Sequence, residues 1–177
     1  EKLKNVLGSD YHVEFAMRYK KPSLKKKLQS WEGKNFKQII ILPLFPHYAS
    51  ATNGSVIEES MDVMKKWWVI PELSFVSQFY NETFYLKGFE EKGNLHDFKE
   101  YDHILFSFHG LPERHVDKVY KDGLCKDNDC EHGINDENIF CYKATCYETA
   151  IQLSKRFKLK EQDYSVGFQS RLGRGWI

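Results

Sequence analysis

The sequence predicts an α/β fold built on parallel β-strands, and three features of the pattern indicate it. Short apolar segments alternate with amphipathic segments of helix length along most of the chain. Two apolar segments, IIILPL (39–44) and HILFSF (103–108), are nearly continuous runs, as in strands buried on both faces of a sheet. Strands separated by helix-length segments favour βαβ units, so a parallel sheet follows.

The first half of the chain, residues 1–91, contains three predicted strands. VEFAM (13–17) and LSFVSQF (73–79) are apolar segments of strand length on either side of IIILPL. Pro22 suits the first turn of a helix, and Thr52 or Asn53 suits the start of another. The second of these helices would carry four apolar side chains: Val56, Met61, Met64 and Trp68. A further helix is predicted over roughly 81–92.

The second half, residues 92–177, begins within the polar stretch EEKGNLHDFKEY (90–101), which we interpret as the boundary between two α/β halves. HILFSF is its first strand. A long helix is predicted from Cys141 to Phe157, and YSVGFQS (164–170) is the last strand.

Composition excludes several classes of partner and location. The net charge of +1 gives no indication of nucleic-acid binding. No apolar run approaches the roughly 20 residues that a membrane-spanning helix needs. No export signal opens the chain, so we expect a cytoplasmic protein. Because the chain starts without Met and stops at Ile177, we also expect it to be a fragment truncated at both ends.

Two predicted strand ends carry residues suited to chemistry. In open α/β sheets, ligands bind beyond the carboxyl ends of the strands. The stretch ILFSFHGLPERHV (104–116) places His109 at such an end, with Gly110 allowing close approach and Pro112 fixing the turn. A neutral imidazole there can accept a proton or bind a metal, whereas a hydrogen-bonded core histidine is the structural alternative.

The proline-rich loop LPLFPHYASATNGS (42–55) follows the other buried strand. Its prolines stiffen the chain, so the loop can wall a pocket at little entropic cost. His47 in this loop could face the same cavity as His109. An ordinary connection between strand and helix is the alternative.

Donors for an anionic ligand end two further strands. Arg18 and Tyr19 follow VEFAM, and the polar residues Gln169, Ser170 and Arg171 follow YSVGF. Guanidinium, amide and hydroxyl groups suit a carboxylate. These residues indicate an acidic small molecule, with surface salt bridges as the alternative for each arginine.

All four cysteines lie between residues 125 and 146, spaced Cys-x4-Cys-x10-Cys-x4-Cys. Disulfides are disfavoured in a reducing cytosol, and clustered thiols there indicate a metal. The spacing departs from the Cys-x2-Cys pattern of common zinc sites, and Cys-x4-Cys spacing occurs among 2Fe-2S proteins. From spacing alone, zinc, iron–sulfur and unpaired buried thiols all remain open.

Five stretches, in order along nearly the whole chain, together resemble ferrochelatases: AMRYKKP (16–22), LPLFPHYASATNGS (42–55), LSFVSQFYN (73–81), FSFHGLPERHV (106–116) and GFQSRLGRGWI (167–177). The resemblance implies the class II chelatase fold, in which two Rossmann-like parallel-sheet halves enclose a porphyrin cleft. It also implies insertion of Fe²⁺ into protoporphyrin IX to form protohaem in haem biosynthesis.

The resemblance also implies roles for individual residues. His109 matches the histidine of the family's SFHGLP motif, which lies at the porphyrin face as proton acceptor or ligand of the incoming Fe²⁺. Arg18, Tyr19, Gln169, Ser170 and Trp176 match segments that bind the porphyrin. The acidic partner of the histidine in the family would lie beyond this chain, so we expect the fragment alone to have little chelatase activity.

The cysteines lie in an insertion, residues 120–146, that most family members lack. The segment is similar to that of a subset of bacterial ferrochelatases with a 2Fe-2S cluster. The resemblance therefore implies a 2Fe-2S cluster on Cys125, Cys130, Cys141 and Cys146, with zinc as the alternative.

Other functions remain open at this point. The chain could be a non-catalytic module that binds or senses haem or iron–sulfur, or a chelatase for coproporphyrin or another metal. Because porphyrins dissolve poorly, peripheral contact with a membrane is compatible with either class.

Overall fold

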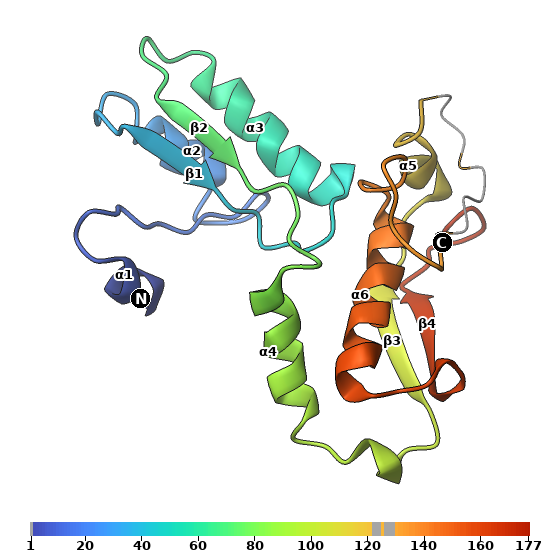
Figure 1. Cartoon of the computed structure of the whole chain (residues 1–177). Helices are drawn as coiled ribbons and strands as arrows, with labels where there is room; N and C mark the ends of the chain where they lie inside the picture. Colours follow the sequence, from blue (N-terminus) through green and yellow to red (C-terminus); the bar gives the residue numbers. More distant parts are fainter. Residues whose placement is uncertain (1, 122–124, 126–129) are drawn as a thin grey trace. The chain divides into compact units, whose positions relative to one another are not determined.

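The chain forms two parallel strand pairs, each joined through helices, in the described part of a computed structural model (Figure 1). The structure describes residues 2–121, 125 and 130–177. The helices are α1 (Lys2–Leu7), α2 (Leu24–Gln29), α3 (Ser55–Met64), α4 (Thr83–Gly93), α5 (Glu113–Asp117) and α6 (Tyr142–Phe157). The strands are β1 (Gln38–Ile41), β2 (Glu72–Phe75), β3 (Ile104–His109) and β4 (Tyr164–Gln169). A π-helical turn covers Ser50–Gly54, and 3₁₀ turns cover Phe98–Glu100 and Glu161–Asp163.

Both strand pairs are βαβ units. β1 pairs in parallel with β2 across α3, with Ile39 opposite Leu73. β3 pairs in parallel with β4 across α5 and α6, with Ile104 opposite Tyr164 and His109 opposite Gln169. The predicted α/β class with parallel strands is therefore confirmed.

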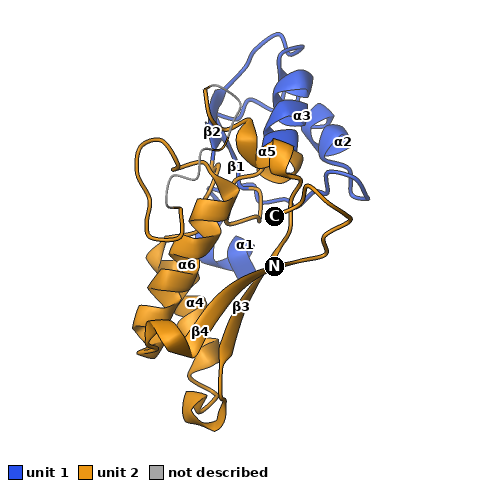
Figure 2. Ribbon diagram, turned by 90° about the vertical axis from the view of Figure 1, so that its right-hand side faces the viewer, with its two compact units in different colours: residues 1–42, 54–75 blue, residues 43–53, 76–177 orange. Residues whose placement is uncertain are grey.

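The chain divides into two compact units (Figure 2). The first contains Glu1–Leu42 and Gly54–Phe75, and the second contains Pro43–Asn53 and Val76–Ile177. The proline-rich loop and α4 thus pack with the second unit. The division of the whole protein into halves at residues 91 and 92 stays a prediction.

The first unit has a small apolar core beneath α2, α3 and the first strand pair. Its buried members are Leu28, Ile39, Val63, Met64 and Trp67. Of the apolar residues expected on the helix after the proline-rich loop, Met61 is 54% exposed, and Trp68, which is 98% exposed, lies beyond the helix, contrary to the prediction. The helix begins at Ser55, later than predicted, and ends at Met64. Trp67 therefore packs inward from beyond its last turn.

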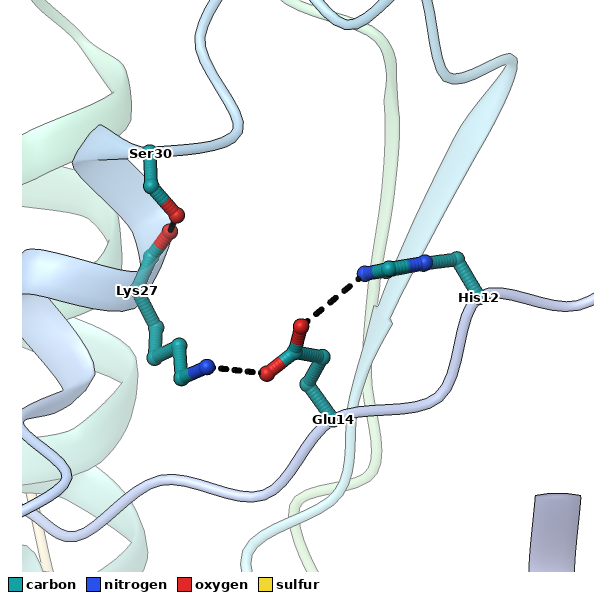
Figure 3. A network of polar contacts seen from close by, with 4 residues as sticks. All are labelled: His12, Glu14, Lys27 and Ser30. Atoms are coloured by element: carbon teal, nitrogen blue, oxygen red, sulfur yellow. Dashed lines mark hydrogen bonds and ion pairs between the residues drawn. The ribbon is translucent and has the colours of Figure 1, made fainter.

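The predicted strand over 13–17 is also wrong. Within the described chain the segment makes only an isolated bridge, between Met17 and Ser23, and Phe15 is exposed. Polar contacts hold it instead (Figure 3): the Glu14 carboxylate binds the Lys27 ammonium of α2 and lies 3.2 Å from His12 Nε2. The hydrogen bond from Lys27 lowers the Glu14 pKa. An apolar segment forms a strand only where a neighbouring strand pairs with it.

The second unit contains the best-predicted elements. α6 spans Tyr142–Phe157 and β4 spans Tyr164–Gln169, each within one residue of its predicted bounds. The buried face of α6 consists of small side chains, among them Ala144, Thr145, Thr149 and Ala150, which allow close packing. α4 contacts this helix, and its Leu86 is buried. None of the helices in the described ranges is both long and apolar enough to cross a bilayer.

Candidate active site

His109 lies at the carboxyl end of β3, directly opposite Gln169 at the end of β4. The two strands extend their pairing by one further bond, from the Gly110 amide to the Gln169 carbonyl at 2.7 Å. The Ser170 hydroxyl donates to Oε1 of Gln169 at 2.7 Å. Three site residues predicted from the sequence, His109, Gln169 and Ser170, therefore lie together at the carboxyl ends of β3 and β4, and all three are exposed. An exposed imidazole beside an amide and a hydroxyl can reach a ligand outside the sheet.

The chain returns to the HGLP turn at its carboxyl end. The Ile177 amide donates to the Leu111 carbonyl at 2.9 Å, and the Glu113 amide donates to the Gly175 carbonyl at 2.9 Å. An isolated antiparallel bridge joins Pro112 to Trp176. The structure thus brings Trp176 to the same turn that follows His109.

Gly110 makes this return possible. A Cβ atom at residue 110 would lie 2.6 Å from the Ile177 carbonyl oxygen and 3.1 Å from the Gln169 carbonyl oxygen. Both neighbours are main-chain atoms, so neither can rotate away. The expectation that Gly110 permits close approach is confirmed.

The proline-rich loop walls a cavity, as predicted. The cavity has a volume of about 580 Å³, within the range of roughly 300–1,000 Å³ typical of ligand sites. Its lining includes Tyr48, Ala49 and Ser50 from the loop, Leu111 from the HGLP turn, His115 from α5, and Tyr142 from α6. The His115 Nδ1 atom is buried and has no hydrogen-bond partner within the described chain. Sequence reasoning missed His115 and Tyr142, because neither stands at a strand end.

His47 is a core histidine. Its Nε2 lies 2.9 Å from the Thr149 hydroxyl, and its ring contacts Tyr80 and Phe108. Burial lowers the pKa of His47 to about 4, so the imidazole is neutral at physiological pH. The expectation that His47 faces a cavity together with His109 is wrong, because packing against these rings encloses it.

Arg18 and Tyr19 lie in the first unit, against the start of α3. Arg18 Nε donates to the Ser55 carbonyl at 3.1 Å, and Nη1 lies 3.3 Å from Glu59 Oε1. The guanidinium carbon lies 4.7 Å from the centre of the Tyr19 ring. Arg18 is therefore held by a carboxylate and a carbonyl of its own unit.

Three of the four cysteines gather around the Tyr120 hydroxyl. This hydroxyl lies 3.7 Å from Cys130 Sγ and also hydrogen-bonds Cys125 and Cys141. Burial raises the pKa of the Cys125 and Cys141 thiols. The cysteines belong to a largely buried apolar cluster that includes Val116.

Cys146 faces a different neighbour. It is buried and hydrogen-bonds Tyr142, and burial raises its pKa well above the ordinary value. All four cysteines are free thiols. Among residues 2–121, 125 and 130–177, no three cysteine, histidine or acidic side chains are arranged to hold a metal ion. Residues 122–124 and 126–129 of the predicted insertion lie outside the described residues.

Comparison with known proteins places the whole chain in one family. The ferrochelatase family model matches residues 1–177. A ferrochelatase of Legionella pneumophila (strain Corby) is 38% identical over 177 residues, covering 99% of this chain and 52% of that protein. A ferrochelatase of Coxiella burnetii (strain Dugway 5J108-111) is 37% identical over 182 residues, covering 100% and 50%. The chain spans about half the length of these relatives. It belongs to the ferrochelatase family.

Proposed function

We propose that the full-length protein containing this chain inserts Fe²⁺ into protoporphyrin IX and so forms protohaem. The observation that carries the proposal is the exposed His109 at the carboxyl end of β3, in a chain that matches the ferrochelatase family throughout. The apolar-walled cavity beside the HGLP turn supports binding of a large flat ligand.

The reaction sets clear chemical demands. Fe²⁺ replaces two pyrrole N–H protons, so two protons must leave the macrocycle as the iron–nitrogen bonds form. An imidazole near neutral pH can accept one of these protons, or it can hold the incoming Fe²⁺ through a neutral nitrogen. His109 is exposed and lies beside the Gln169 side chain, so it is accessible for either role.

The remaining proposed porphyrin-binding residues supply polar and aromatic contacts. Gln169 and Ser170 offer an amide and a hydroxyl at the strand edge, and Trp176 offers an indole at the HGLP turn. Arg18 and Tyr19 are also proposed to contact the porphyrin. Because Arg18 binds Glu59, its contribution would be to shape the site as much as to bind a propionate.

Metal insertion by the full-length protein tests the proposal. We expect His109→Ala to lower the rate of zinc insertion into porphyrin by at least 100-fold, the scale of losing a positioned acid–base group. His103→Ala is the matched control, because His103 lies just before the same strand and its Nε2 lies 3.0 Å from the Ser165 hydroxyl. Porphyrin binding without turnover in the unmodified protein would instead indicate a binding module.

We further propose that Cys125, Cys130, Cys141 and Cys146 hold a 2Fe-2S cluster, with zinc as the alternative. Thiolates are the usual ligands of such clusters, and three of the thiols already surround Tyr120 in an apolar environment. Cys146 would have to leave Tyr142 to join them. When bound, a cluster would tie the insertion to the start of α6.

The electronic spectrum distinguishes the two metals. We expect the purified full-length protein to be coloured, and each single Cys→Ser variant to lose the visible absorption. Colourless protein that contains zinc would favour the alternative, and metal-free protein would contradict both. The proposed location is the cytoplasm, with peripheral contact to a membrane.

A further inference from the structure

The start of α6 contacts the main chain of His109. The Tyr142 hydroxyl donates a hydrogen bond to the His109 carbonyl oxygen at 2.9 Å. The tyrosine ring also packs edge-on against His47, at a centroid distance of 5.9 Å. Tyr142 is therefore a fixed donor directed at the backbone of the candidate catalytic residue.

A single peptide group is held at both ends. Its carbonyl belongs to His109 and accepts from Tyr142, while its N–H belongs to Gly110 and donates to the Gln169 carbonyl at 2.7 Å. The orientation of this peptide sets the direction in which the exposed imidazole leaves the strand. Losing either hydrogen bond allows the plane of the peptide between His109 and Gly110 to rotate. Displacements of about 1 Å in a catalytic group can lower reaction rates by about two orders of magnitude.

Tyr142 also lies between two of the cysteines. Cys141 is the N-cap residue of α6. Cys146 hydrogen-bonds Tyr142 from the next turn of the helix. The donor that holds His109 is thus anchored in the part of α6 where two of the four thiols lie.

We propose that Tyr142 is a positioning residue: it orients the His109 peptide for metal insertion and makes that orientation depend on the cysteine-bearing start of α6. This inference rests on the proposed function of His109. It assigns to Tyr142, which also lines the cavity, a role exerted through the main chain of His109.

The test compares Tyr142→Phe with Tyr147→Phe in the full-length protein. Both remove one hydroxyl from α6, and that of Tyr147 donates to Glu131 Oε1 at 3.0 Å, away from His109. We expect Tyr142→Phe to lower kcat for zinc insertion roughly threefold to tenfold, the range for one hydrogen bond, with KM for porphyrin unchanged. Tyr147→Phe should leave both constants unchanged. Replacing Tyr142 with 4-aminophenylalanine restores a donor and should recover most of the rate.

A second measurement does not depend on activity. Amide hydrogen exchange at Gly110 should become faster in Tyr142→Phe and stay unchanged in Tyr147→Phe. Unchanged kcat and exchange in Tyr142→Phe would overturn the inference. So would a rate loss that follows the unfolding midpoint and is not restored by the amino variant. If the unmodified protein shows no metal insertion, the proposed function fails instead; if His109→Ala retains full activity, only the proposed role of His109 fails. In both cases the exchange result still reports whether Tyr142 holds the peptide.

Discussion

Replacing Gly110 with alanine tests how tightly the HGLP turn is built. The added Cβ would meet the Ile177 carbonyl oxygen at 2.6 Å, the Gln169 carbonyl oxygen at 3.1 Å and Arg171 Cγ at 3.2 Å. Only the arginine side chain can move without moving backbone. To accommodate the methyl group, either β3 must move away from β4, or the HGLP turn must move away from residues 175–177.

The magnitude follows from these two contacts. Forcing a methyl group into a closely packed site costs about 1–3 kcal/mol. Weakening the bond from the Gly110 amide to the Gln169 carbonyl adds about 1 kcal/mol. Alanine also restricts the unfolded chain, which offsets about 0.5 kcal/mol. The free energy of unfolding should therefore fall by about 1.5–3.5 kcal/mol.

Urea unfolding of the full-length protein measures this change. The control is Gly88→Ala on the exposed face of α4, where an added Cβ meets nothing within 4 Å. There alanine favours the helix, so stability should rise by about 0.5–1 kcal/mol. Equal or greater stability of Gly110→Ala relative to the unmodified protein would refute the close approach of residue 110 to Ile177.

Two further predictions concern buried polar side chains. The His47 pKa is about 4 when folded and 6.5 when unfolded, so the unfolded chain binds more protons between these values. The free energy of unfolding should fall by about 3 kcal/mol as pH drops from 6.5 to 4; an unchanged pH dependence in His47→Gln would contradict this. Asn53 is fully buried and donates to the Phe45 and Ser77 carbonyls. Asn53→Ala should lower the free energy of unfolding in urea by about 2–4 kcal/mol, because it leaves both carbonyls unpaired. The control, Asn81→Ala at an exposed position, should lower it by less than about 0.5 kcal/mol. Similar losses in the two variants would exclude a role of Asn53 in holding the loop.

The sequence predicted an element correctly where its apolar pattern matches the way that the element packs in the fold. β3, β4 and α6 were found within a residue or two because their apolar periodicity continues to the end of each element. VEFAM (13–17) is a short apolar segment like those two strands. It lacks a partner strand among the described residues, however, and is fixed by the ion pair between Glu14 and Lys27. Adjacent Trp67 and Trp68 are chemically identical, so only the observed end of α3 reveals which one is buried.

In the candidate site, too, some features were predictable from the sequence and others were not. Side chains at strand ends were predictable, because parallel strands bring their carboxyl ends together; His109 and Gln169 are an example. Asn53 suited a helix cap by residue type, yet its amide instead ties the proline-rich loop to the Ser77 carbonyl. The four cysteines were readily found, but their spacing does not reveal that Tyr120 collects three and Tyr142 faces the fourth.

The position of His109 depends on groups that carry no functional signature in the sequence. Its peptide is held by a tyrosine 33 residues away and by the main chain of β4, and the next residue must be glycine because a carboxyl-terminal carbonyl lies against it. Each of these contacts acts on backbone atoms, which every residue possesses. A histidine motif therefore identifies the reactive group, whereas the direction of its side chain is set by the helix and strand that close around it.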